Sequence, residues 1–405
     1  MNKIRVIELF AGYGSQHLAL KRLKRDYPEF EYEVVAFCEI DENAIKAYHA
    51  LHGDNIPNLG DITQVNPSDV PDCDLMTWSF PCQSISSAGL QHGLAEGSGT
   101  RSSLCWNAVR IFEAKRPKYL LMENVSALVS DKFIGDFNLL QSSLQKIGYT
   151  NFTQLMNAKD YGVPQNRLRV FMVSVLDCSQ AYYFPKPFPL TRRLKDVLEQ
   201  NVAERYYLKE EQVQKLMAAT QSNEPQDNVM LGWTRSNTGK GDPTYHPVSV
   251  ANCVTAAKRD NTQNYVVEPQ VQQVCNLIGD REGKFANPQR GRIDSPAGLA
   301  PAVDTAQGGN LVAKIIEQAK TAHPSRGIIM IKNTPCWVRR LTERELFRLM
   351  DVDENDIDTL LNAGISNTQL AKLAGNSVVC ACYYHIFHAL FIETTPPPNT
   401  QTQLF

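Results

Sequence analysis

Alternating strand-like and helix-like segments in the first part of the chain limit its fold more than any other sequence feature. Apolar runs typical of buried strands occupy residues 4–9, 32–40, 73–80, 118–125 and 168–176. Segments with helical periodicity between them cover residues 17–25, 41–51, 103–114 and 137–148. A helix that crosses over one face lets the next strand run parallel to the last. The pattern therefore predicts an α/β protein whose parallel sheet is covered on both faces.

A proline-rich segment, YYFPKPFPL at 182–190, ends this pattern because proline breaks both helix and strand. From there to about Pro335 the sequence is irregular, with short strand candidates at 264–268 and 327–331. Helical periodicity returns at 341–350 and 367–391. We therefore expect a separate β-rich module with many loops, then helices, then a flexible tail.

The composition excludes several classes of protein. Of the 405 residues, 43% are hydrophobic and 21% charged, as in an ordinary globular protein. The formal net charge is −2, so any surface that binds nucleic acid must be a local one. No run is typical of a signal peptide or long enough to span a bilayer, and ten cysteines without such a signal fit a reducing compartment. We expect a cytoplasmic protein with no membrane partner.

The segment ELFAGYGS places Gly12 and Gly14 between the first expected strand and its helix, where a ligand can approach the backbone. A dinucleotide fingerprint would have a third glycine where His17 stands, which argues against NAD and an oxidoreductase. Glu39 ends the second expected strand and can hold ribose hydroxyls, or it is a solvated strand end. Asp61, in GDIT, can accept from an adenine amino group or cap a turn.

Cys82 lies in SFPCQS, on a Gly/Ser-rich loop that follows an expected strand. A thiolate there can act as a nucleophile, although a single cysteine is more often a small core residue. Glu123 ends the fourth expected strand and so faces the same sheet edge. Arg167 and Arg169, two residues apart in QNRLRV, are expected on one face of an extended segment. Together these groups predict a catalytic site.

The segment CACYYHIFH contains two cysteines and two histidines, Cys380, Cys382, His385 and His388, which together resemble a zinc-ligand set. On a continuous helix these four side chains cannot converge tetrahedrally. We therefore interpret the segment as a helix facing the core, and we expect no metal site.

These motifs, taken in order, resemble the DNA (cytosine-5) methyltransferases of bacterial and phage type over nearly the whole chain. FAGYG resembles the cofactor loop, PCQ at 81–83 the nucleophile motif, and ENV at 123–125 with QNRLR at 165–169 the motifs that hold the base. RRLTERE from Arg339 and GNSV from Gly375 match two further motifs. Tyr13 and Ser15 depart from the usual aliphatic residue and glycine of the cofactor loop.

The resemblance implies a Rossmann-like fold of the S-adenosylmethionine-dependent methyltransferases with a smaller β-rich target-recognition domain. The catalytic and cofactor-binding domain would cover 1–185 and the target-recognition domain 189–340. A segment at 341–392 would return to the catalytic domain, and 393–405 would be the tail.

The implied reaction transfers a methyl group from S-adenosylmethionine to carbon-5 of a flipped cytosine in duplex DNA and leaves S-adenosylhomocysteine. Cys82 would form a covalent adduct with the base, and Glu123, Arg167 and Arg169 would be the other catalytic residues. Two alternatives stay open. A tRNA cytosine-5 methyltransferase is disfavoured by the long recognition segment, and an inactive DNA-binding homologue by the intact catalytic residues.

The resemblance also implies binding residues. Those for the cofactor are Phe10, Gly12, Gly14, Glu39, Ile40, Asp61, Ile62, Pro81 and Asn376. Those for DNA are Gln83, Ser87, Arg101, Arg290, Arg292, Gln307, Gly308 and Gly309, because arginine can read guanine edges and glutamine adenine edges, although phosphate contact or solvation competes for each. We expect a monomer that associates with the nucleoid through DNA, with a cognate restriction endonuclease as a candidate partner. The residues do not predict the recognition sequence.

Overall fold

The structure, a computed structural model, describes residues 3–82, 85, 94, 100–179, 181–212, 214, 326 and 334–393, and the backbone of short strands between 230 and 331. The chain divides into two compact units. The first consists of Met1–Asn157, Leu168–Pro187 and Val378–Phe405, and the second of Ala158–Arg167 and Phe188–Ser377. This division puts 341–377 in the second unit, and the chain re-enters the first unit at Val378.

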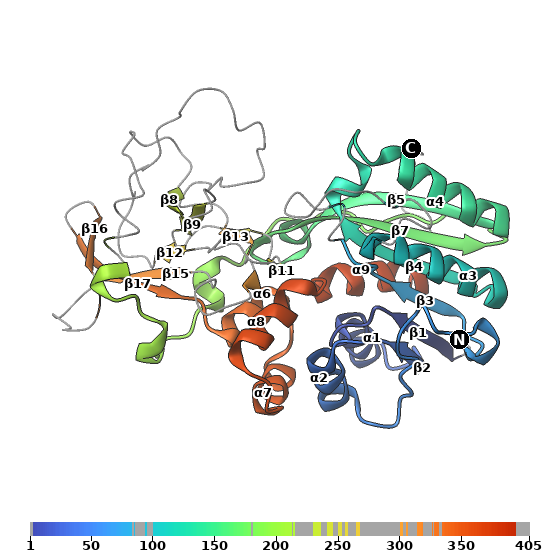
Figure 1. The fold of residues 1–405 in the computed structure, drawn as a ribbon, viewed down its shortest axis with the longest axis horizontal. Coiled ribbons are helices and arrows are strands. Elements are labelled where there is room, and N and C mark those ends of the chain that lie inside the picture. The colour runs from blue at the N-terminus through green and yellow to red at the C-terminus, as the bar shows by residue number, and fades with distance from the viewer. Residues whose placement is uncertain are drawn as a thin grey trace. The chain divides into compact units, whose positions relative to one another are not determined.

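A six-stranded sheet forms the centre of the first unit (Figure 1). Its order is β2 (Tyr32–Cys38), β1 (Ile4–Leu9), β3 (Leu75–Trp78), β4 (Tyr119–Val125), β7 (Leu168–Leu176) and β5 (Tyr149–Asn157). The first four strands pair in parallel, as expected, but β7 is antiparallel to both of its neighbours. The prediction of a wholly parallel sheet is therefore wrong at this end. The short connection from β5 to β7 contains no crossover helix and reverses the chain.

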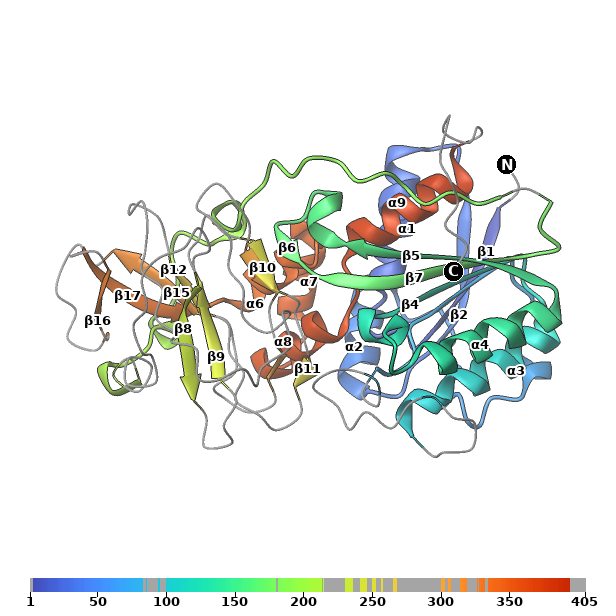
Figure 2. The ribbon, with the colours of Figure 1, turned by 90° about the horizontal axis from the view of Figure 1, so that it is seen from above.

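Helices cover both faces of this sheet, as the sequence predicts. Figure 2 shows α3 (Cys105–Lys115) and α4 (Ile134–Ile147) on one face and α1 (Ser15–Asp26) and α9 (Cys380–Phe391) on the other. Helix α2 (Glu42–His52) begins at Asp41, whose side chain accepts hydrogen bonds from the backbone N–H groups of Asn43 and Ala44. The apolar faces of α3 and α4 pack in one core with alternate residues of β1, β3 and β4.

Helix α9 confirms the interpretation of CACYYHIFH as a helix that faces the core. Cys380 and Cys382 are both buried, and Phe391 makes an edge-to-face contact with Tyr119 of β4. In the part of the chain that the structure describes, no group of three His, Cys, Asp or Glu side chains is arranged to hold a metal ion.

The second unit is rich in strands, as expected. Its largest sheet has the order β16 (Ile328–Ile331), β17 (Thr334–Arg340), β15 (Lys314–Gln318), β12 (Tyr265–Val267), β9 (Gly241–Tyr245) and β8 (Met230–Arg235). Strands β10 (Val250–Asn252), β13 (Ala300–Ala302) and β6 (Gln165–Asn166) pair with one another, as do β11 (Ala256–Ala257) and β14 (Thr305–Ala306). Three helices follow, α6 (Glu343–Leu349), α7 (Glu354–Asn362) and α8 (Asn367–Asn376).

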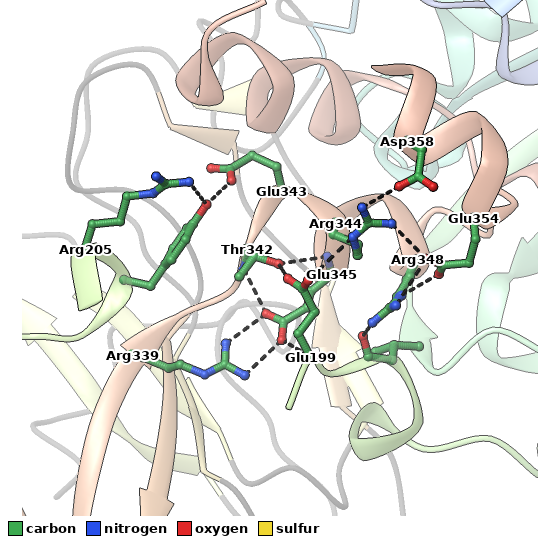
Figure 3. Close-up of polar contacts among 12 residues, drawn as sticks. Glu199, Arg205, Arg339, Thr342, Glu343, Arg344, Glu345, Arg348, Glu354 and Asp358 are labelled. Atoms are coloured by element: carbon green, nitrogen blue, oxygen red, sulfur yellow. Dashed lines mark hydrogen bonds and ion pairs between the residues drawn. The ribbon is translucent and has the colours of Figure 1, made fainter. Parts of the chain in front are cut away.

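A buried ion pair joins β17 to α6 in the second unit. Figure 3 shows Arg339 facing Glu345, with two N–H···O contacts of 2.9 Å, and both side chains are fully buried. Glu345 also accepts from the backbone N–H groups of Thr342 and Glu199, both at 2.8 Å. The Thr342 hydroxyl in turn accepts from the Glu345 N–H, which completes a capping box at the start of α6. The RRLTERE motif thus has a structural role, because it connects β17 to the start of α6.

Glu345→Gln is expected to destabilise the protein by about 3–5 kcal/mol, because it leaves the Arg339 guanidinium buried without its counter-charge. The control is Glu354→Gln, which breaks ion pairs of a half-exposed carboxylate with Arg344 and Arg348 and is expected to cost less than about 1 kcal/mol. Urea unfolding followed by circular dichroism measures both. Equal losses of unfolding free energy in the two variants would contradict this role of the Arg339–Glu345 ion pair.

Candidate active site

The turn after β1 has an unusual backbone. Phe10, Gly12 and Gly14 all have positive φ angles, of 56°, 58° and 79°. Among the described residues, no atom lies within 4 Å of a Cβ built on Gly12, whereas a Cβ on Gly14 would lie 2.5 Å from Nε2 of His52. Gly12 thus leaves space for a ligand beside the backbone, and Gly14 is needed for close packing beneath the turn.

Glu39 follows β2 and is bound to this turn. Its Oε2 accepts from the backbone N–H of Gly12 at 2.8 Å, and its Oε1 accepts from those of Ile40 and Asp41 at 2.8 and 2.9 Å. Its backbone N–H and C=O are both bound by the Asn58 side chain, at 3.1 and 3.0 Å. A carboxylate has further lone pairs, so Glu39 can also accept from a ligand's hydroxyls. The role of Asn58 was not predicted from the sequence.

Three other predicted cofactor residues lie near the ends of these strands. The Ile40 side chain is 67% exposed, which is unusual for a large apolar side chain and offers a surface to a flat ring. Asp61 is exposed, and its Oδ1 accepts from the N–H and the hydroxyl of Thr63, both at 2.9 Å. Ile62 is only 3% exposed and packs in the core, so its side chain supports the loop from below.

A buried polar cluster lies beneath the turn. Glu8, the one charged residue among the buried positions of β1, accepts a hydrogen bond of 2.5 Å from the Tyr48 hydroxyl. His17 Nδ1 lies 3.3 Å from the same hydroxyl, and the His17 ring stacks on His52 with centroids 4.0 Å apart. His52 Nε2 lies 3.1 Å from the carbonyl oxygen of Tyr13, inside the turn. This cluster therefore links β1, α1 and α2 to the turn.

Burial keeps this cluster uncharged. It raises the pKa of Glu8 to about 8 and lowers the pKa of His52 to about 3, and it also lowers the pKa of His17 well below its ordinary value. At neutral pH the carboxyl group is protonated and both imidazoles are neutral. The sequence signal of this cluster is an acidic residue within an apolar strand, with two histidines in the adjacent helices.

Cys82 follows β3 on a segment that is held from both sides. Asn124 of β4 donates its side-chain N–H to the carbonyl oxygen of Phe80 at 3.0 Å. The Ser102 hydroxyl donates to the carbonyl oxygen of Pro81 at 2.6 Å. The Cys82 side chain is partly buried against the core. A partly exposed thiol on a fixed backbone suits a nucleophile that must attack a planar ring.

Glu123 and Arg169 meet at the same end of the sheet. Glu123, at the end of β4, is 6% exposed, and its Oε1 lies 3.1 Å from Nε of Arg169. Arg169 is near the start of β7 and pairs with Val125 in the antiparallel ladder. Because β7 runs opposite to β4, its first residues lie at the carboxyl ends of the parallel strands, where Cys82 also follows β3.

Arg167 does not share this arrangement, so the prediction that the two arginines lie on one face of a single extended segment is wrong. Strand β6 ends at Asn166 and β7 begins at Leu168, so Arg167 lies in neither. Its guanidinium donates to the carbonyl oxygens of Gly375, at 3.2 Å, and Ser377. Within the second unit it therefore fixes the backbone on both sides of the exposed Asn376.

Of the residues predicted to bind DNA, the structure places one. Arg101 is exposed at the start of a 3₁₀ helix, Arg101–Leu104. The others, Gln83, Ser87, Arg290, Arg292, Gln307, Gly308 and Gly309, lie outside the described residues. Within the described ranges, no helix is both long and apolar enough to cross a membrane.

The wild-type protein is expected to lose stability as the pH rises from about 6.5 towards 8, because folding holds Glu8 protonated, at a cost of about 1.4 kcal/mol per pH unit. Between pH 4.5 and 6.5 the same cost is offset by neutral His52, whose contribution to stability rises with pH from its folded pKa of about 3 to 6.5. Glu8→Gln should abolish the loss above pH 6.5 and leave the dependence below pH 4.5 unchanged. Urea unfolding between pH 4 and pH 9 measures this, and parallel curves would contradict it.

Comparisons with known proteins identify the family of the chain. A family model, described as C-5 cytosine-specific DNA methylase, matches residues 4–391. The chain is 32% identical to the type II methyltransferase M2.ScrFI of Lactococcus lactis subsp. cremoris, over 96% of this chain and 99% of that protein. It is 26% identical to the orphan methyltransferase M.SPBetaI of Bacillus phage SPbeta, over 96% and 98% of the two chains.

Solved structures support the fold alone. The Entamoeba histolytica methyltransferase EhMeth has a TM-score of 0.63 at 15% identity, and S. pombe Dnmt2 has 0.58 at 17%. Each comparison covers 96% of this chain and 98% of the other. The family match extends over nearly the whole chain, from residue 4 to residue 391. The chain belongs to the C-5 cytosine-specific DNA methylases and is a DNA (cytosine-5) methyltransferase.

Proposed function

We propose that this protein methylates carbon-5 of cytosine within one short sequence of duplex DNA, with Cys82 as the covalent nucleophile. The observation that carries the proposal is the meeting of a carboxyl group and a guanidinium, Glu123 and Arg169, at the sheet edge where Cys82 follows β3. The family gives the reaction, and these positions supply a thiol, a proton donor and a cation where the family's chemistry requires them.

The turn after β1 fits S-adenosylmethionine. Gly12 leaves room beside the backbone, Glu39 is fixed with lone pairs to spare for ribose hydroxyls, and Ile40 exposes apolar surface to an adenine ring. In this proposal Asp61 accepts from the adenine amino group. Phe10, Gly14, Ile62, Pro81 and Asn376 complete the predicted set. When bound, S-adenosylmethionine supplies an electrophilic methyl group.

Carbon-5 of cytosine is a weak nucleophile, so the protein must first activate the ring. The Cys82 thiolate forms a bond to carbon-6, and Glu123, in its protonated form, donates a proton or a hydrogen bond to the ring nitrogen, which takes up the electron pair. The ring becomes an enamine whose carbon-5 would take the methyl group, and S-adenosylhomocysteine would leave. A base then removes the carbon-5 proton, the double bond re-forms, the ring nitrogen gives up any proton that it received, and Cys82 leaves as a thiolate. Arg169 orients Glu123 throughout.

Carbons 5 and 6 are inaccessible in a stacked duplex, so the cytosine must be flipped out of the helix. We assign catalysis to residues 1–185 and sequence reading to the β-rich region at 189–340, and the chain returns to the catalytic domain within 341–392, at Val378. The protein would act as a cytoplasmic monomer. The relatives include a type II and an orphan methyltransferase, so the family is compatible with a cognate endonuclease and with its absence.

Incubation with tritiated S-adenosylmethionine and duplex DNA, followed by bisulfite sequencing, tests this function. We expect label at carbon-5 of cytosine within one short motif, and a loss of at least about 10⁴-fold in Cys82→Ala, since this variant lacks the nucleophile. Cys105→Ala, which removes a buried thiol of α3, is the matched control and should retain activity. Label in tRNA only, or full activity of Cys82→Ala, would overturn the proposal.

A further inference from the structure

The residue that leads out of β3, Ser79, is held by a side chain from the far end of the chain. Its Oγ lies 3.0 Å from the hydroxyl oxygen of Tyr383 on α9, and the two share a hydrogen bond. Tyr383 is completely buried. We propose that Tyr383 is a positioning residue for Cys82, acting through Ser79. This inference rests on the proposed function, in which Cys82 is the nucleophile.

The Tyr383 ring is fixed in place by aromatic contacts. It meets Phe171 of β7 edge to face, with centroids 5.8 Å apart, and stacks on Phe387 of α9 with centroids 5.7 Å apart. Phe171 is the ladder partner of Glu123, so the ring packs at the level of the catalytic carboxyl group. The hydroxyl group therefore has one defined position, close to the exit of β3.

The hydroxyl is kept neutral and close to the catalytic carboxyl group. Burial raises the pKa of Tyr383 well above its ordinary value, and the nearby charge of Glu123 raises it further. The phenol thus stays protonated throughout the working pH range and can share a hydrogen bond with Ser79 at all times. A permanent hydrogen bond of this kind suits a positioning role better than a proton-transfer role.

The three residues before Cys82 are each held from a different element. Tyr383 of α9 holds the Ser79 side chain, Asn124 of β4 holds the Phe80 carbonyl, and Ser102 holds the Pro81 carbonyl. The Ser79 contact bridges 304 positions of sequence. The contact therefore links the C-terminal part of the chain, which re-enters the first unit at Val378, directly to residues 79–82, the catalytic segment.

If the hydrogen bond only stabilises the core, its loss would lower the melting temperature without a selective effect on the chemical step. If the bond positions Cys82, its loss would slow methyl transfer at saturating substrate, while KM for DNA and for S-adenosylmethionine stays within about twofold. These two roles can therefore be separated by kinetics together with a stability measurement on the same variants.

The experiment compares Tyr383→Phe, Ser79→Ala and the double variant in single-turnover methylation of duplex DNA. Each single variant should slow methyl transfer about three- to tenfold, the factor that corresponds to one neutral hydrogen bond. The double variant should be no slower than either, because both substitutions remove the same bond. Ser79→Ala tests the proposal even if the core variant Tyr383→Phe folds poorly.

The matched control is Tyr384→Phe, the same change at the next position of α9. Tyr384 is hydrogen-bonded to Asp26, and its ring contacts His385 and His388 of the same helix. This variant should methylate at the wild-type rate. Rates of Tyr383→Phe and Ser79→Ala within twofold of wild type, or independent effects that multiply in the double variant, would overturn the inference.

A second measurement separates this inference from the proposed function. Alkylation of Cys82 by iodoacetamide in the free protein, followed by peptide mass spectrometry, needs no DNA. The rate should change by at least about threefold in Tyr383→Phe and Ser79→Ala and not in Tyr384→Phe. If the wild type methylates no DNA, the proposed function fails, and unchanged alkylation rates would refute the positioning role independently.

Discussion

The ion pair between Glu123 and Arg169 depends on the direction of a single strand. Because β7 runs antiparallel to β4, Arg169 lies near the start of its strand, at the edge where β4 ends. In a parallel arrangement the start of β7 would lie at the opposite edge, about 20 Å away along a strand of this length. The antiparallel strand is thus what lets a carboxyl group and a guanidinium meet beside the segment that carries Cys82.

Buried polar groups support this edge from behind. Under the cofactor turn, Glu8 and Tyr48 share a hydrogen bond and His52 contacts the turn's backbone, all in uncharged form. Under the catalytic segment, Tyr383 reaches Ser79. Isolated charges in these places would be costly, whereas neutral hydrogen-bonded groups fix the backbone at little cost. Neutral hydrogen bonds therefore support both loops from beneath.

Periodicity predicted the four parallel strands and the helices between them, because their apolar residues repeat with a clear period. It missed β5, whose sequence YTNFTQLMN is mostly polar, and with it the reversal that makes β7 antiparallel. Motif spacing brought Cys82 and Glu123 to one edge, but the assumption of an unbroken strand misplaced Arg167. Contacts such as Ser79 with Tyr383, far apart in sequence, follow from tertiary packing and leave no local pattern.

The most direct test of the account is to identify the atom that attacks the base. Duplex DNA that contains 5-fluorocytosine at the methylated position traps the covalent adduct, because the fluorine cannot leave as a proton does. Peptide mass spectrometry of the trapped complex should find the DNA on Cys82 alone. A bond to any other cysteine, or methylation of normal DNA without a trapped adduct, would contradict the account.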